Sequence, residues 1–235
     1  MSQTTTAPAL PTADEGRTLV ADAGRILSGL GLVDYLGHSS MRVEGGVIVK
    51  PKHSPTIRDA SHLTAEQMVL VNLDGELLEG NDPPPSEVYI HTEIYRARPD
   101  VGAVVHTHQK AATLLGVLEA PIRPILHIPS SYVDDVHLWP HANLVADRSL
   151  GAELAAALGD ASYCHLQGHG IISVAPTLKE AVVGAVMMEE LAVANLEALR
   201  TGLTPREIPE GELAELRRLR GGIEGRWQYL IEQFG

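Results

Sequence analysis

The stretch Val101-Gly-Ala-Val-Val-His-Thr-His108 is typical of a β-strand that ends in a pair of histidines. Its β-branched valines favour an extended backbone, and Pro99-Asp100 interrupts whatever element precedes it. Because side chains alternate between the two faces of a strand, His106 and His108 are expected to point the same way. Two neighbouring imidazoles on a rigid strand can bind one metal ion.

A third histidine that could bind the same ion lies in the segment His165-Leu-Gln-Gly-His-Gly-Ile-Ile172. His169 stands between Gly168 and Gly170, where the backbone can turn tightly and come close to a site. Three histidines with an open coordination position are the pattern of a catalytic metal rather than a structural one. The chain holds 11 histidines, so a chance pair that is merely packed or hydrogen-bonded is the alternative.

The composition is that of an acidic chain of 235 residues, with 18 Lys and Arg against 30 Asp and Glu and a formal charge of −12. This charge argues against nucleic acid or an anionic membrane as a partner, and an anionic small-molecule substrate would need local positive groups or a metal. The single cysteine, Cys164, argues against an internal disulfide framework. With no apparent signal peptide or apolar run of membrane-spanning length, we predict a cytoplasmic protein.

The periodicity of the chain predicts one domain over residues 14–235, after a disordered tail over residues 1–13. Ser86 is expected to cap a helix that runs to Arg98. Further helices are expected over residues 14–30, 110–118, 150–158, 177–200 and 210–234, the last interrupted by Gly221-Gly222. Hairpins are expected over residues 37–50 and 163–174, and a strand over residues 69–73. Strands with helices on each side predict a three-layer α/β fold, and the hairpins favour a mixed, mainly antiparallel sheet.

Glu87 is the next candidate for chemistry after the histidines. A carboxylate at the start of a helix usually interacts with the helix dipole and nothing more. Here the helix leads directly into the histidine strand, so Glu87 could share a cleft with the metal and act as a general acid or base. His91 follows one turn later on the same face, where it would orient Glu87 or simply pack.

Together these motifs resemble those of the class II aldolase/adducin family. The matching strings, in chain order, are Gly37-His-Ser-Ser40, Pro85-Ser-Glu87, His91, Arg98-Pro-Asp100, Ala103-Val-Val-His-Thr-His108 and Leu166-Gln-Gly-His-Gly170. The resemblance runs from about residue 15 to about residue 205. It implies a three-layer α/β/α sandwich around a mostly antiparallel sheet. It also implies a homo-oligomer, usually a tetramer with sites between subunits. The C-terminal aromatics Trp227, Tyr229 and Phe234 are consistent with an oligomer, because they would need an apolar surface to cover.

The resemblance also implies roles for individual residues. His106, His108 and His169 match the family's metal ligands, and Glu87 matches its acid/base carboxylate. The cofactor would be one divalent metal ion per subunit, zinc in the first place and otherwise cobalt, manganese or iron. The adducin branch lacks the metal histidines. Because this chain keeps all three, a non-catalytic metal-binding scaffold is the outside alternative.

The substrate-facing motifs depart from those of the sugar-phosphate aldolases in the family. His38 stands where those aldolases have Asn, and Lys50-Pro-Lys-His-Ser-Pro55 replaces their loop of small hydroxyl residues and glycine. Without glycine this loop offers no phosphate-binding nest, and it is similar to the loop of dihydroxyphthalate-type decarboxylases. Ile128 stands where the aldolases have a tyrosine, which leaves Tyr132 as the nearest one.

We therefore expect a metal-dependent carbon–carbon lyase that decarboxylates a dihydroxylated aromatic acid such as 3,4-dihydroxyphthalate. The alternative is an aldolase, or a related epimerase or dehydratase, acting on a sugar phosphate or another hydroxy-carbonyl compound. A solvated loop is the alternative explanation of the two lysines. The residues expected to contact the anionic substrate are His38, Ser39, Ser40, Lys50, Lys52, His53, Ser86 and Tyr132.

Overall fold

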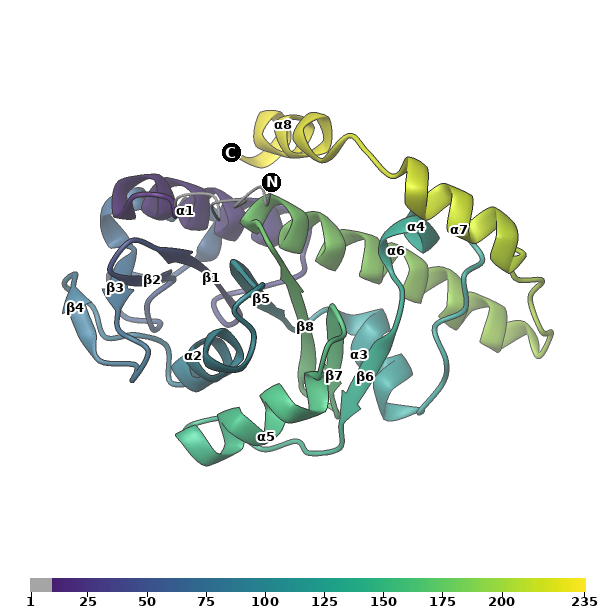
Figure 1. Cartoon of the computed structure of the whole chain (residues 1–235), viewed down its shortest axis with the longest axis horizontal. Helices are drawn as coiled ribbons and strands as arrows, with labels where there is room; N and C mark the ends of the chain where they lie inside the picture. Colours follow the sequence, from purple (N-terminus) through teal and green to yellow (C-terminus); the bar gives the residue numbers. More distant parts are fainter. Residues whose placement is uncertain (1–9) are drawn as a thin grey trace, which may run out of the picture.

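An eight-stranded sheet forms the middle layer of the computed structural model, which describes residues 10–235 (Figure 1). The strands lie in the order β4-β3-β2-β1-β5-β8-β7-β6, and each neighbouring pair is antiparallel except β6 and β7. Their bounds are β1 His38–Val43, β2 Gly46–Val49, β3 Val69–Val71, β4 Leu77–Glu79, β5 Ala103–Thr107, β6 Val136–Trp139, β7 Tyr163–Leu166 and β8 Gly170–Ala175. The predicted mixed, mainly antiparallel sheet is confirmed.

Two layers of helices cover the sheet, with α2 and α5 on one face and α1, α3, α6 and α8 on the other (Figure 1). The helices are α1 Ala13–Gly29, α2 Val88–Ala97, α3 Lys110–Val117, α4 Pro129–Tyr132, α5 Arg148–Leu158, α6 Leu178–Thr201, α7 Glu210–Leu219 and α8 Ile223–Phe234. Each face has its own hydrophobic core. On β5 the alternation is clear, since Val105 joins the core under α6 and Val104 joins the core under α2. The three-layer α/β/α sandwich is confirmed.

The start of the described chain is tied to the fold by hydrogen bonds. Thr12 and Glu15 form a capping box at the start of α1, and Pro11 accepts a hydrogen bond from Glu44 N–H at 2.9 Å. Of the predicted disordered tail, residues 1–9 lie outside the described residues.

The structure corrects the predicted start of the helix before the histidine strand. α2 begins at Val88, its N-cap residue is Glu87, and that residue makes no side-chain capping bond. Ser86 therefore does not cap the helix. The reason lies in the preceding prolines: the Val88 N–H donates to Pro85 O at 3.0 Å, so a turn precedes the helix and places Ser86 beside the site instead.

The C-terminal segment forms two helices rather than one interrupted helix. Gly222, at a φ of 79°, separates α7 from α8. Trp227 on α8 is 4% exposed and belongs to the core that also contains α1 and α6, and Phe234 packs against the same core. The apolar surface that these two residues need lies in the same chain, so they give no support to an oligomer; Tyr229 remains exposed. No helix within residues 10–235 is long and apolar enough to cross a membrane.

Candidate metal centre and active site

The three candidate ligands meet at one end of the sheet. His106 lies one residue before the end of β5, His108 comes directly after the strand, and His169 lies in the turn between β7 and β8. β5 and β8 are antiparallel neighbours with Thr107 opposite Ile171, which brings this turn beside the end of β5. A Cβ at Gly170 would collide with the Thr107 carbonyl oxygen, so only glycine permits this approach. The ligand atoms of the three histidines lie within 4.8 Å of one another.

The donor set fits a divalent metal ion. The carbonyl oxygen of Ile171 lies 3.0 Å from His106 Nδ1 and can only accept, so Nδ1 carries the hydrogen and His106 Nε2 keeps its lone pair. His108 Nε2 lies 3.1 Å from that atom. Burial lowers the pKa of both imidazoles, which keeps them neutral and able to bind a metal. Three imidazoles at this spacing leave coordination positions free for a substrate.

Glu87 directs one carboxylate oxygen toward this centre and fixes the other. The side chain is 6% exposed, and its Oε1 accepts a hydrogen bond from Val145 N–H at 3.0 Å. Its Oε2 lies 3.6 Å from His169 Nε2 and 3.8 Å from His106 Nε2. The carboxylate is thus held by the backbone on one side and remains available for proton transfer on the other.

A cavity of about 330 Å³ opens onto His108, His169 and Glu87. Four of the predicted substrate contacts line it, namely His38, Lys52, His53 and Ser86. The remaining walls are mainly apolar and come from Tyr35, Leu36, Pro85 and Leu144. The rings of Tyr35 and His53 lie with their centroids 4.8 Å apart. The cavity therefore combines apolar walls with nitrogen-bearing side chains.

The other predicted substrate contacts do not line this cavity. Ser39 is buried and its hydroxyl has no partner among the described residues. Ser40 is buried beneath His38 and bonds to His91 and Tyr95.

Lys50 is also buried, and its Nζ donates to the Tyr35 carbonyl oxygen at 3.1 Å. Burial lowers the pKa of Lys50 to about 8. Tyr132 lies toward the opposite end of the sheet and donates to Gly221 O at 3.1 Å, so the fold does not bring it to the site within one chain.

Sequence reasoning missed three parts of the site. The apolar walls Tyr35, Leu36 and Leu144 belong to loops, and their only signal was large apolar residues in otherwise irregular segments. The Val145 N–H is a backbone donor and has no side-chain signature. The partner of His91 was also missed: it bonds to His38 at 2.7 Å and not to Glu87.

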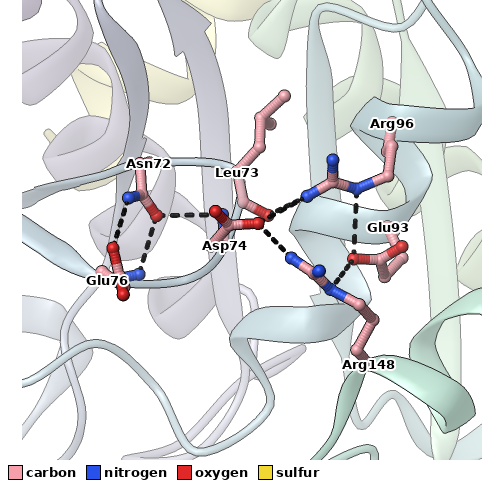
Figure 2. Close-up of polar contacts among 7 residues, drawn as sticks. All are labelled: Asn72, Leu73, Asp74, Glu76, Glu93, Arg96 and Arg148. Atoms are coloured by element: carbon pink, nitrogen blue, oxygen red, sulfur yellow. Dashed lines mark hydrogen bonds and ion pairs between the residues drawn. The ribbon is translucent and has the colours of Figure 1, made fainter.

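A polar network supports the segment that carries Val145 (Figure 2). Arg148, the first residue of α5, pairs with Asp74 in the β3–β4 turn and with Glu93 on α2, the latter at 3.2 Å. Arg96 on α2 reaches the same two carboxylates, at 3.0 Å for Asp74 and 3.4 Å for Glu93. The β3–β4 turn, α2 and α5 are thereby linked through one set of charges, as Figure 2 shows.

The fold and the site together define an α/β/α protein with a candidate three-histidine metal centre beside a carboxylate. The model of the class II aldolase and adducin N-terminal domain matches residues 18–196 of the chain. The chain belongs to this family.

Relatives and a solved structure agree with this placement. The chain is 35% identical to a 3,4-dihydroxyphthalate decarboxylase of Arthrobacter keyseri, with 88% of each chain covered. It is 33% identical to a 5-methylthioribulose-1-phosphate/5-deoxyribulose-1-phosphate aldolase of Rhodospirillum rubrum, with 82% of this chain and 85% of the aldolase covered. The crystal structure of an aldolase II superfamily protein from Pseudomonas syringae shares the fold, with a TM-score of 0.81, 22% identity, and 97% and 94% of the two chains covered.

Proposed function

We propose that this protein is a metal-dependent carbon–carbon lyase that removes a carboxylate from a dihydroxylated aromatic acid, such as 3,4-dihydroxyphthalate. The observation that carries the proposal is the cavity, in which Tyr35, Leu36 and Leu144 form apolar walls suited to a flat ring. Lys52 and His53 lie at the same cavity and offer donors to carboxylates. A relative named as a 3,4-dihydroxyphthalate decarboxylase supports the same reaction class.

His106, His108 and His169 would hold a divalent ion, which would supply a Lewis acid that stabilises the negative charge developing on the substrate. The histidine tautomer supports this assignment, since His106 Nδ1 donates to Ile171 O and leaves Nε2 for the ion. Zinc is the expected ion, with cobalt, manganese or iron as alternatives.

Different residues of the chain bind the substrate and transfer the proton. The apolar walls hold the ring, and Lys52 and His53 bind a carboxylate of the substrate. Glu87 acts as the general acid through Oε2, the oxygen directed at the histidines, while Val145 N–H holds Oε1. When the bond between that carbon and the carboxylate breaks, carbon dioxide leaves. The electron pair stays on the ring carbon and takes the proton of Glu87, which is replaced from solvent.

The experiment that tests the proposal measures carbon dioxide release from a panel of dihydroxybenzoates and dihydroxyphthalates by the zinc-loaded protein. Release from at least one acid, lost on chelation and restored by added metal, is the expected result. The same preparations are assayed for retro-aldol cleavage of ketose phosphates. Cleavage of a ketose phosphate without carbon dioxide release from any acid would contradict the proposal and favour the aldolase alternative, which the Rhodospirillum rubrum relative represents.

We also propose that the protein forms a homo-oligomer, expected to be a tetramer with sites at subunit interfaces. An apolar groove on α6, lined by Leu30, Leu32, Leu126 and Val193, supports this proposal. Light scattering at micromolar concentration tests it, and a monomer would contradict it.

A further inference from the structure

His38 belongs to two overlapping sets of side chains, and the structure decides which role it takes. Its Nε2 lies 3.9 Å from Glu87 Oε2, and His38, Glu87 and His106 form a second group with ligand atoms close enough to hold a metal. A metal ligand must offer a lone pair at Nε2, whereas a hydrogen-bond donor must carry a hydrogen there. The role of His38 therefore depends on which of its ring nitrogens is protonated.

The other nitrogen of His38 begins a buried chain of hydrogen bonds between β1 and α2. His38 Nδ1 lies 2.7 Å from His91 Nε2, and His91 Nδ1 lies 2.6 Å from Ser40 Oγ. Ser40 Oγ lies 2.8 Å from Tyr95 Oη. The spacing of these residues in the sequence produces this series of hydrogen bonds. His38 and Ser40, two apart, share a face of β1, and His91 and Tyr95, four apart, share a face of α2. All four side chains are at most 7% exposed.

The direction of the chain follows from counting donors. The Tyr95 hydroxyl has one hydrogen, and among the described residues Ser40 Oγ is the acceptor within reach, since the Val104 backbone N–H beside the hydroxyl can only donate. If Tyr95 donates to Ser40, Ser40 donates to His91 Nδ1, and His91 Nε2–H donates to His38 Nδ1. Every hydrogen between these four side chains then has an acceptor, and the hydrogen on His38 Nε2 is left for the cavity that His38 lines. In the reverse direction the Tyr95 hydroxyl hydrogen is left buried without an acceptor, which is unfavourable.

We propose that His91, held by Ser40 and Tyr95, is a positioning residue that fixes His38 with its hydrogen on Nε2, and that His38 donates this hydrogen bond to a carboxylate of the substrate. The second half of this inference rests on the proposed function; the tautomer does not. A cationic His38 would carry a hydrogen on Nε2 as well, so the donor role of Nε2 does not depend on the protonation state, whereas the hydrogen bond from His91 requires the neutral imidazole. His38 is thereby a donor to an anion and not a metal ligand, which leaves the metal to His106, His108 and His169.

Neutron diffraction from deuterated crystals of the zinc-loaded protein tests the tautomer directly. Deuterium is expected on Nε2 of both His38 and His91, with His91 Nδ1 bare. Deuterium on His38 Nδ1 with a bare His38 Nε2 would overturn the proposal. Because this measurement involves no substrate, it can fail while the decarboxylase proposal stands, and it can succeed if no acid proves to be decarboxylated.

Metal content separates the two possible sets of ligands. His38→Gln retains an N–H donor near the position of Nε2 and should keep the zinc content of the wild-type protein. His108→Ala should lose most of its zinc. A loss of zinc in His38→Gln as large as that in His108→Ala would assign His38 to the metal and overturn the proposal.

Measurements of ligand binding distinguish two roles of His91: positioning of His38 and support of the fold. The probes are 2,3-dihydroxybenzoate and catechol, which differ by the carboxylate, titrated into the zinc-loaded protein by calorimetry. His91→Leu should weaken binding of the acid about tenfold and leave catechol unchanged, because one hydrogen bond to a charged group is lost. His165→Leu, which removes another buried imidazole, is the matched control and should change neither.

A double substitution completes the test. In the His38→Gln background the donor is the amide N–H of the glutamine, which does not depend on the hydrogen bonds through His91, Ser40 and Tyr95. Adding His91→Leu should therefore produce no further loss of acid binding. Equal weakening of both probes by His91→Leu, or a further tenfold loss in the double variant, would assign His91 a purely structural role. If His91→Leu does not fold, the tautomer in the wild-type crystal still decides the proposal.

Discussion

Each end of the sheet carries a cavity lined by polar side chains, and the two cavities differ in whether those side chains are already paired. The cavity at the start of β5, about 170 Å³, is lined by Arg98, Tyr132, Tyr163 and Arg220 among others. Arg98 pairs with Asp100 and donates to two carbonyl oxygens, and the three other side chains each donate to a backbone carbonyl. These groups use their hydrogen bonds to hold loops together.

At the opposite end the polar groups keep free capacity. His106 Nε2 and His108 Nε2 face each other at 3.1 Å, and Glu87 Oε2 faces the same centre without a direct hydrogen bond among the described residues. Buried polar groups are normally paired, so a cluster that leaves lone pairs directed at one point marks a binding site. The pairing of polar groups, more than the presence of charge or the depth of a cavity, distinguishes the candidate site from the cavity at the other end of this sheet.

The largest expected effect comes from loss of the metal at the histidine end. His108→Ala should lower zinc content from about one ion per subunit to a small fraction and abolish measurable turnover, since a catalytic ion is held by three protein ligands. Elemental analysis and the carbon dioxide assay measure the two effects. Tyr163→Phe, which removes a buried hydroxyl at the opposite cavity, is the control and should leave both unchanged. Full zinc occupancy in His108→Ala would contradict the assignment.

Glu87→Gln tests whether the free oxygen at this end carries the proton. The substitution keeps the shape and the hydrogen bond from Val145 but removes the transferable proton, so kcat should fall about 10²- to 10⁴-fold. Zinc content and the affinity for 2,3-dihydroxybenzoate should stay near the wild-type values. Glu180→Gln alters a carboxylate at the opposite cavity and serves as the control. Turnover within twofold of wild type in Glu87→Gln would remove Glu87 from the reaction.

Lys50 lies at the histidine end of the sheet, and its buried ammonium has one acceptor within residues 10–235, the Tyr35 carbonyl oxygen. Burial lowers its pKa from 10.5 to about 8, so between these values the unfolded chain binds more protons than the folded one. The free energy of unfolding should therefore rise with pH across this window, by about 3 kcal/mol from this group. Urea titrations of wild type and Lys50→Met from pH 7.5 to pH 10.5 measure the difference. An identical pH dependence in the two proteins would contradict the prediction.

Lys52 has the smallest expected effect. If the lysine binds a substrate carboxylate equally in the ground state and the transition state, Lys52→Ala should raise KM about tenfold and leave kcat unchanged. Lys179→Ala is the control. It removes a positive charge that is paired with Glu224 and does not line the cavity, so it should change neither KM nor kcat. Unchanged KM in Lys52→Ala would favour a solvated loop as the explanation of this lysine.

Elements whose signals are local could be predicted from the sequence. The alternation of β5 predicted that His106 and His108 point together, and the glycines beside His169 predicted a close backbone approach; both are found. The hairpin of β1 and β2 and the long helix α6 also follow from periodicity. Strands β4 and β6 and the short helix α4 were missed, because runs of three or four residues carry too little pattern to be distinguished from loops.

The tertiary structure alone decided how these local pieces serve the site. Tyr132 has the right type for a substrate contact, but the fold places it toward the opposite cavity. Lys50 lies in the expected loop, yet it turns inward to a carbonyl. The pairing of His38 with His91 depends on the packing of α2 against β1. Spacing along a chain fixes which face a side chain occupies, whereas its partner is set by strand register and by the packing of layers that are distant in sequence.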